Sequence, residues 1–342
     1  MRLGTQLAYA GDPTKVVDEI VRWEAAGLDV VWVAEAYGFD APTLMGYVAA
    51  RTERVQIGSG ILPIYSRTPA LIAQTAAGLD AVSGGRAILG LGTSGPQVIE
   101  GWHAVPFDRP VARTREIVEI CRQAWRREPL VHDGIYQLPL PPERGTGLGK
   151  PLKMLTHPVR DRIPIHIASL GAANVRLTAE VADGWLPFMF LPEKAGEVWG
   201  TPLAEGTAKR SPDLGPLDVV AGGPLAVGDD VTGLRDLARP MVALYVGGMG
   251  ARGRNFYNDL ACRYGYEAAA VKIQDLYLAG RKEEAAAAVP AELLELTSLI
   301  GPEGYVRERI EAFRAAGVTT LNVIPMDPDP VRLLGRVKEW LA

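Results

Sequence analysis

A glycine-rich turn at residues 92–96 is the segment of this sequence best suited to chemistry. It reads Gly-Thr-Ser-Gly-Pro and lies between the apolar run Ala87–Leu91 and the start of a helical pattern. Such a turn exposes backbone N–H groups beside the hydroxyls of Thr93 and Ser94, and the following helix points its positive end the same way, which suits an anionic cofactor. Because any parallel α/β protein needs small residues where a strand turns into a helix, a purely structural role is equally open at this point.

Other polar side chains also follow apolar runs. Glu35 ends the continuous apolar run Val30–Ala34. Its carboxylate serves either as a functional group or as a cap for backbone N–H groups. Asp40 precedes Pro42 by two residues and is expected to cap the next helix. His103 follows the glycine-rich turn, where a hydrogen bond within the site and a structural role are both open.

The remaining titratable residues predict neither a hydrolase nor a metal site. The four histidines are scattered, and Cys121 and Cys262 are the only cysteines. We expect both thiols to be free and buried in a cytoplasmic protein. The turn lacks the spacing of a nucleophile elbow. Because so few side chains at these positions could act as a general acid or base, we predict that a cofactor carries the reaction.

A second glycine-rich segment, Gly247–Asn255, contains Arg252 and Arg254. A loop of this kind can hold a phosphate or carboxylate tail, and it can equally hold a subunit interface. The sequence leaves both interpretations open.

The elements that must position these residues alternate between strand and helix patterns from the start of the chain. Their number favours a closed (β/α)8 barrel over an open doubly wound sheet, although strand count alone does not prove closure. In a barrel, the site would lie at the carboxyl ends of the strands. The predicted strands are Arg2–Ala8, Val30–Ala34, Val55–Ile61, Ala87–Leu91, Pro164–Ala168, Gly184–Phe188, Leu217–Val227 and Val318–Pro325.

Two stretches are longer than a barrel requires. Val131–Arg162 is rich in proline and glycine and is interpreted as an insertion after the fourth helix. Asp230–Gly301 has a mostly helical pattern and is interpreted as a helical excursion before the last strand. It would cover the barrel mouth or form a subunit contact. We therefore predict one TIM-barrel domain over residues 1–342.

Composition narrows the range of partners. Hydrophobic residues make up 48% of the 342, which is enough for a large core, and the net charge is −4. This balance does not favour binding to nucleic acid or to a membrane surface. The N-terminal apolar run is too short for a signal peptide, and no run is long enough to span a bilayer. These features predict a cytoplasmic protein.

Several segments taken together resemble the bacterial luciferase-like superfamily. The resemblance is strongest to its deazaflavin-dependent oxidoreductases, which are relatives of methylenetetrahydromethanopterin reductase, and it covers nearly the whole chain. The segments that carry it are Gly58–Gln74, Leu89–His103, Ile167–Pro187 and Leu244–Leu260.

The resemblance implies a (β/α)8 barrel that binds coenzyme F420, or alternatively FMN, with a cis peptide bond at Gly60–Ile61 behind the ring. We take Glu35 and His103 as the catalytic candidates, with Glu35 handling the proton, and we expect no metal. Tyr9, Tyr65 and Trp185 would help to shape the pocket. The cofactor-binding residues that it implies are Glu35, Ser59, Gly60, Ile61, Thr93, Ser94, Ser169, Leu170, Gly171 and Ala173.

One departure from the family bears on the reaction. The relative that oxidises a sugar phosphate has an acid–histidine pair at the end of the second strand, whereas Ala36 follows Glu35 here. Reduction of an activated double bond, imine or carbonyl in a small, hydrophobic or planar substrate is therefore favoured. The alternatives are an FMN-dependent monooxygenase that uses reduced flavin and O2, and a non-catalytic cofactor-binding protein. The resemblance also implies a homodimer.

Overall fold

Eight parallel strands close into a barrel in the computed structural model, which describes residues 1–7 and 11–342. The ring closes because β1 pairs with β2 on one side and with β11 on the other, where Arg2 lies opposite Thr320. The prediction of a barrel is confirmed, and the open sheet is excluded. The strands are β1 (Arg2–Leu7), β2 (Val30–Val33), β3 (Gln56–Ser59), β5 (Ala87–Gly92), β6 (Ile165–Ala168), β7 (Gly184–Leu186), β8 (Asp218–Ala221) and β11 (Thr320–Pro325).

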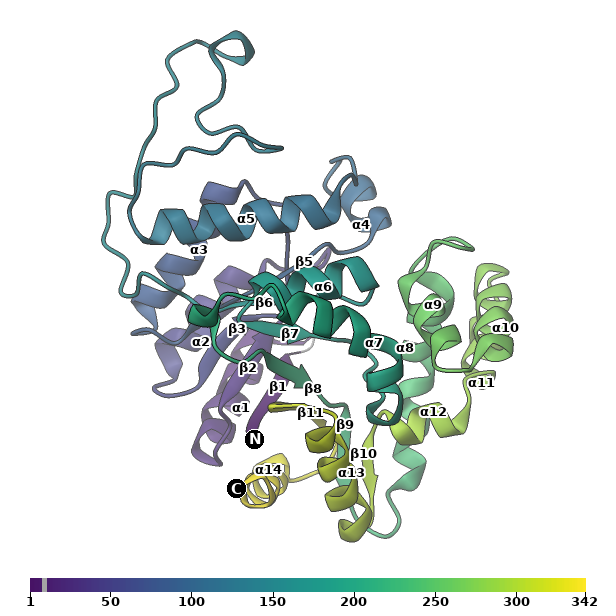
Figure 1. Ribbon diagram of the computed structural model, residues 1–342. Helices are drawn as coiled ribbons and strands as arrows, with labels where there is room; N and C mark the ends of the chain where they lie inside the picture. The colour runs from purple at the N-terminus through teal and green to yellow at the C-terminus, as the bar shows by residue number, and fades with distance from the viewer. Residues whose placement is uncertain (8–10) are drawn as a thin grey trace.

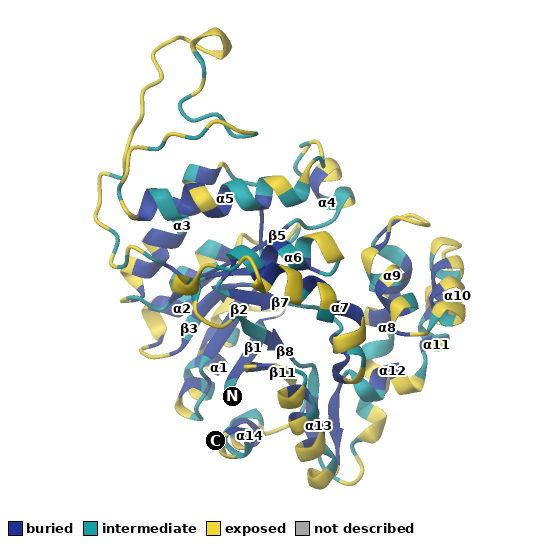
Figure 2. Ribbon diagram, in the orientation of Figure 1, coloured by how far each residue is buried: buried dark blue, intermediate teal, exposed yellow. Residues whose placement is uncertain are grey.

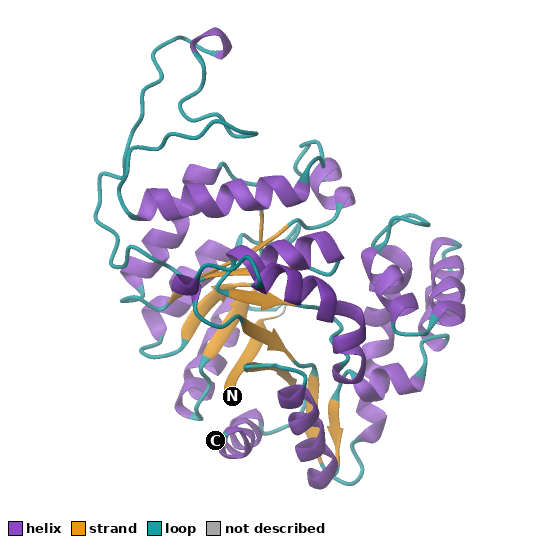
Figure 3. Cartoon of the chain, in the orientation of Figure 1, coloured by secondary structure: helices purple, strands orange, loops and turns teal. Residues whose placement is uncertain are grey.

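Helices surround the barrel (Figures 1 and 3). Asp12, Asp40 and Thr68 cap the first three of them, and a proline follows each cap within two residues. A side-chain oxygen at the cap and a proline with fixed φ in the first turn both favour a helix start. The helices are α1 (Pro13–Ala25), α2 (Ala41–Arg51), α3 (Pro69–Val82), α4 (Pro96–Gly101), α5 (Pro110–Trp125), α6 (Ala172–Val181), α7 (Pro192–Thr207), α13 (Glu303–Ala315) and α14 (Pro330–Leu341).

The core has two layers. A large apolar layer lies between the barrel and the helices, and a small cluster containing Trp32, Ile88 and Val220 fills the barrel. Gly58 makes room for the indole, because a Cβ at this position would lie 2.4 Å from the Trp32 ring. The barrel is therefore filled by side chains and is not an open channel.

The predicted strand Leu217–Val227 is two strands in the structure. β8 ends at Ala221, and β9 (Pro224–Val227) begins after two glycines, with both strands pairing with β11. A Cβ at Gly222 would lie 2.1 Å from the carbonyl oxygen of Asn322. The glycine pair therefore lets the backbone approach β11 closely while the chain changes direction.

The amino end of the barrel is held by a network of buried and partly buried polar groups. Arg2 donates hydrogen bonds to Asp218, to Thr320 at 3.1 Å and to Gln56 at 2.5 Å. His166 Nε2 lies 2.8 Å from the Asp218 carboxylate. These side chains join β1, β3, β6, β8 and β11 at the end of the barrel opposite the site, where polar groups serve stability.

The Pro- and Gly-rich stretch 131–162 projects away from the barrel (Figure 1). It contains one short 3-10 turn, η1 (Pro142–Arg144), and an isolated antiparallel bridge between His132 and Leu138. Figure 2 shows that much of this segment is exposed. Its apolar side chains include Leu148 and Leu155, which are 83% and 95% exposed.

The stretch 230–301 folds mainly as short helices beside α7 (Figure 1). It ends at β10 (Leu299–Gly301), which pairs with β9. Within the described residues, no helix is both long and apolar enough to cross a membrane. The elements before β10 are η3 (Thr232–Ala238), α8 (Arg239–Ala243), the π-helical η4 (Leu244–Gly248), α9 (Phe256–Arg263), α10 (Glu267–Leu278), α11 (Lys282–Ala287) and α12 (Ala291–Leu296).

Candidate functional site

Two neighbouring helices at the carboxyl end of the barrel begin without a side-chain cap. Their N-cap residues are Gly95 before α4 and Gly171 before α6, and neither offers an oxygen to the free N–H groups. The preceding strands β5 and β6 are paired, with Gly92 opposite Ala168, so the two helix starts lie close together. Free N–H groups at a helix start attract anions. The two starts are therefore compatible with a negatively charged ligand, although α5, α7 and α13 also begin without a side-chain cap.

Seven of the ten predicted cofactor-binding residues are partly or fully exposed at this end of the barrel. Ser94 has a positive φ of 55°, which turns the chain sharply into α4. The Thr93 hydroxyl donates to the adjacent Ser94 carbonyl at 3.1 Å. The seven are Gly60, Ile61, Thr93, Ser94, Leu170, Gly171 and Ala173.

Two of the three predicted serines, Ser59 and Ser169, are buried and have structural partners. Ser59 Oγ donates to the Gly90 carbonyl and accepts from the Gly90 N–H, both at 2.8 Å. Ser169 Oγ lies 2.8 Å from Thr178 Oγ1, and the Ser169 carbonyl accepts from the Trp185 indole at 2.9 Å. Both hydroxyls therefore hold the turns that carry the site, and their direct contact with a cofactor stays a prediction.

The Gly60–Ile61 peptide bond is cis, as the resemblance implies. The Gly60 N–H donates to the Val33 carbonyl at 2.7 Å, which ties this turn to β2. A Cβ at Gly92 would lie 2.8 Å from the Ile61 side chain. Ile61 therefore packs close against β5.

Glu35 forms a buried ion pair that its sequence position did not predict. Its two oxygens lie 2.5 and 2.8 Å from the guanidinium of Arg67, and Oε2 also accepts from the Ala41 N–H at 2.8 Å. The carboxylate therefore caps the start of α2, which was one of the two alternatives. Arg67 was missed as its partner, although it follows the end of the third predicted strand. In this geometry Glu35 positions the β2–α2 loop, and its proton-handling role stays a prediction.

His103 lies just after α4. Its backbone N–H donates to the Val98 carbonyl at 3.3 Å, while its Nε2 is buried. Within the described part of the chain, that nitrogen has no hydrogen-bond partner. A buried ring nitrogen without a partner can accept a hydrogen bond from a ligand or donate one to it. Its catalytic role stays a prediction.

Two residues predicted to shape the pocket belong to the core instead. Trp185 is 1% exposed and packs against Trp199 of α7, because its side chain points out of the barrel while that of Leu186 points in. Tyr65 donates its hydroxyl to the Asp108 carbonyl at 2.8 Å. Burial raises the pKa of Tyr65 to about 12. Those two predictions were wrong, and Tyr9 lies outside the described residues.

Aromatic side chains from distant segments meet at the carboxyl end of the barrel. Tyr37 follows β2 and lies 6.5 Å from Trp102, centroid to centroid, while Phe188 follows β7 and lies 4.5 Å from Tyr245 of η4. Burial raises the pKa of Tyr245, and the nearby Tyr37 raises it further. The helical excursion therefore approaches the β2–α2 loop, and aromatic groups form part of this end of the barrel.

The second glycine-rich segment is tied to the excursion itself. Asn255 caps α9 and donates to the Tyr245 and Val246 carbonyls at 2.9 and 3.0 Å. Arg252 pairs with Asp275 of α10 at 2.8 Å. Arg254 is exposed. Among the described residues, no group of three or more His, Cys, Asp or Glu side chains could hold a metal ion.

Replacing Asp40 by alanine is expected to lower the free energy of unfolding by about 1 kcal/mol. Its carboxylate accepts from the Thr43 N–H at 3.2 Å, so the substitution leaves this N–H without its cap. Urea denaturation followed by circular dichroism measures the change. Asp230→Ala, at an exposed loop position, is the control and should change the value by less than 0.5 kcal/mol. Equal effects in the two variants would contradict the capping role.

Comparisons with known proteins agree with the geometry. The sequence matches the luciferase-like monooxygenase family over residues 1–320. It is 42% identical over 97% of both chains to Rv3520c of Mycobacterium tuberculosis, a candidate coenzyme F420-dependent oxidoreductase. It is 29% identical to the 5,10-methylenetetrahydromethanopterin reductase of Archaeoglobus fulgidus, over 92% of this chain and 91% of the relative.

Among solved structures, the F420-dependent tetrahydromethanopterin reductase from Methanopyrus kandleri has the same fold. Its TM-score is 0.78 at 24% identity, with 99% of this chain and 97% of that chain covered. The resemblance noted in the sequence is confirmed by these matches. The chain belongs to the luciferase-like monooxygenase family.

Proposed function

We propose that this protein is a coenzyme F420-dependent oxidoreductase that passes hydride between the deazaflavin and a small organic substrate. The 42% identity to the mycobacterial relative, over nearly the full length of both chains, supports the cofactor and the reaction class. The observation that carries the proposal is the pair of uncapped helix starts at α4 and α6, beside the Gly60–Ile61 turn.

The residues at this end of the barrel fit a flat cofactor with an anionic tail. The N–H groups before and within the first turn of α6 would bind the charged tail, because a Cβ at Gly171 would meet no atom within 4 Å. Gly60 and Ile61 would support the ring from the side of Trp32. When bound, the deazaflavin supplies a carbon that accepts or donates hydride.

The chain's own side chains would then exclude water and hold a proton. Tyr37 and Trp102 would form an aromatic wall beside the substrate. The unpartnered Nε2 of His103 is the atom best placed to hydrogen-bond a substrate oxygen or nitrogen. Glu35 keeps the β2–α2 loop in position through Arg67. As part of the same proposal, the protein works in the cytoplasm as a homodimer.

Binding of F420 to the purified protein tests the proposal, and Ala173→Asp sharpens the test. Ala173 is exposed in the first turn of α6, so the added carboxylate should repel an anionic tail and raise the Kd of F420 at least tenfold. The same charge favours the helix dipole, so Tm should not fall. Ala268→Asp, exposed in the first turn of α10, is the matched control and should leave the Kd unchanged.

Activity is measured as the oxidation of reduced F420 in the presence of enones, imines and ketones. No change in F420 absorbance or fluorescence with protein at tens of micromolar would overturn the proposal. Turnover with reduced FMN and O2 but none with reduced F420 would select the monooxygenase. Tight binding of F420 without turnover of any acceptor would select the non-catalytic protein.

A further inference from the structure

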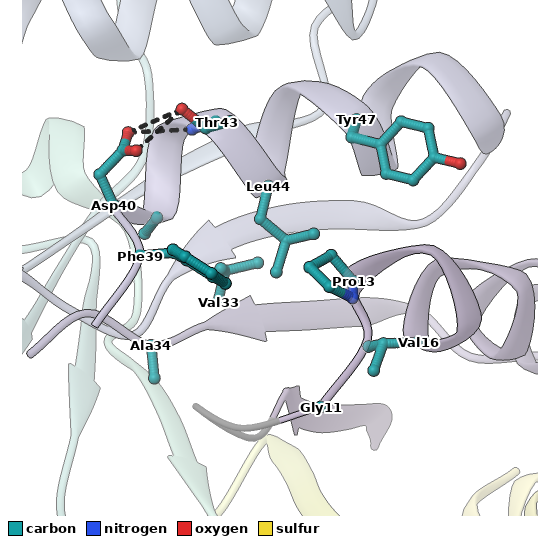
Figure 4. A pocket seen from close by; sticks show the side chains of 11 residues that line it. Gly11, Pro13, Val16, Val33, Ala34, Phe39, Asp40, Thr43, Leu44 and Tyr47 are labelled. Carbon is teal, nitrogen blue, oxygen red and sulfur yellow. Dashed lines mark hydrogen bonds between the residues drawn. The ribbon is translucent and has the colours of Figure 1, made fainter.

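A cavity of about 230 Å³ lies between the starts of α1 and α2, next to the carboxyl end of β2. Figure 4 shows Leu44 pointing from α2 toward Pro13, and it draws Phe39 and Val33 among the side chains that line the cavity. Among the described residues, the cavity is lined by Gly11, Pro13, Val16, Val33, Ala34, Phe39, Asp40, Ala41, Thr43, Leu44 and Tyr47.

The polar side chains of this cavity already have partners in the protein. Asp40 accepts from the N–H and the hydroxyl of Thr43, at 3.2 and 2.9 Å. The Tyr47 hydroxyl accepts from Arg51 at 2.8 Å. A ligand would gain little from hydrogen bonds with these groups, whereas apolar carbon atoms would be covered by the aliphatic and aromatic walls. The cavity therefore suits an uncharged apolar group.

The volume sets the size of that group. An apolar cavity of about 150 Å³ in another protein holds benzene. A cavity of about 230 Å³ therefore accommodates one ring with a short alkyl substituent, or a branched alkyl chain. Phe39 lines the cavity and is 78% exposed, so the apolar surface continues out of the cavity.

The loop between β2 and α2 connects this cavity with the candidate site. Phe39 and Asp40 line the cavity, while Tyr37, two residues earlier, packs against Trp102 at the carboxyl end of the barrel. Glu35 holds both ends of the loop, since it follows β2 and accepts from the Ala41 N–H. The β2–α2 loop, which the buried Glu35–Arg67 ion pair anchors, thus contributes side chains to the walls of both the cavity and the candidate site.

We propose that this cavity binds the apolar part of the substrate, while the reacting end of that molecule lies at the carboxyl end of the barrel. The inference rests on the proposed function, and it names the substrate class as an apolar carbonyl or enone compound with a ring or alkyl tail. Specificity for the tail then resides in Val16, Leu44 and Phe39, outside the groups that hold the cofactor.

The first experiment measures toluene binding to the protein without cofactor, by ligand-observed NMR titration. Val16→Phe and Leu44→Phe each fill part of the cavity and should raise the Kd of toluene at least tenfold. Val271→Phe makes the same change on the exposed face of α10 and should leave the Kd unaltered. Thermal unfolding verifies that each variant is folded. An unchanged toluene Kd in both cavity variants would overturn the site.

The second experiment measures binding of 2-butanone, 2-hexanone and 2-octanone to the F420-loaded protein. Affinity should rise with chain length in the wild type and in Val271→Phe, and it should stay flat in Val16→Phe. The same rise in Val16→Phe would overturn the assignment to the substrate, even if toluene binds in the cavity. Failure to load F420 would instead refute the proposed function, because the toluene experiment does not depend on the cofactor.

Discussion

Replacing Glu35 by alanine is expected to lower the free energy of unfolding by about 3–5 kcal/mol. The Glu35 and Arg67 side chains are only 6% and 14% exposed, and their atoms meet at 2.5 and 2.8 Å. The substitution leaves a buried guanidinium without its counter-charge and the Ala41 N–H without its acceptor. Urea denaturation followed by circular dichroism measures the loss.

Two further variants separate the ion pair from a general effect of truncation. Asp18→Ala removes the partner of Arg51 in an exposed pair and should cost no more than about 1 kcal/mol. Glu35→Ala combined with Arg67→Ala should cost less than the sum of the single variants, because no unpaired charge is left. A Glu35→Ala loss as small as that of Asp18→Ala would contradict the buried pair.

Replacing Asp218 by asparagine is expected to cost about 1.5–3 kcal/mol at pH 7, because the hydrogen bonds from Arg2 and His166 lose their charged acceptor. Burial by itself would raise the pKa of this carboxyl. The hydrogen bond and charge of His166, together with Arg2 and Thr319, nevertheless hold the pKa of Asp218 well below its usual range. The loss is measured as the difference in unfolding free energy between wild type and variant.

The difference in unfolding free energy between wild type and Asp218→Asn should become smaller as the pH falls. A carboxyl whose pKa is lower in the folded protein stabilises the fold above its unfolded pKa, about 3.9. That contribution is lost as the pH falls toward the folded pKa. The gap between wild type and Asp218→Asn should therefore be full at pH 7 and shrink below about pH 4. Asp229→Asn, at an exposed position, should show almost no gap. A gap that stays constant from pH 7 to pH 3 would contradict this account.

The two residues act at opposite ends of the barrel. Asp218 joins strands at the amino end, so its loss should weaken the fold without altering the shape of the site. Glu35 anchors the loop that carries Tyr37 and Phe39, so its loss should also disturb the walls where we propose that the substrate binds.

Local sequence patterns were enough to favour a barrel over an open sheet and to predict several of its details. The continuous apolar run Val30–Ala34 predicted a strand covered on both faces, because only a buried parallel strand needs apolar side chains on both sides. Asp40 before Pro42 predicted a helix cap, and the structure confirms it. Such features depend on neighbours within a few residues, which the sequence displays directly.

Partners that lie far apart in the chain could not be predicted in this way. Glu35 meets Arg67 across 32 positions, and Ser59 meets Gly90 across 31. Both contacts exist because parallel strands and the loops after them are adjacent in space. The pattern showed that these side chains end strands, but it did not show which neighbour would take up their hydrogen bonds.

The face on which a strand residue lies was also decided by the tertiary structure. Trp185 and Leu186 are adjacent, yet one packs under α7 and the other lies inside the barrel. Successive side chains on a strand point to opposite sides. A shift of one residue therefore moves a side chain from the layer between the barrel and the helices to the inside of the barrel. The sequence thus determined the order of strands and helices and the polar residues at their ends. Closure of the ring decided which of those residues can contact a ligand. Residues that become adjacent in the fold occupy the space around some of these side chains and satisfy their hydrogen-bonding groups, and the sequence does not show which residues become adjacent.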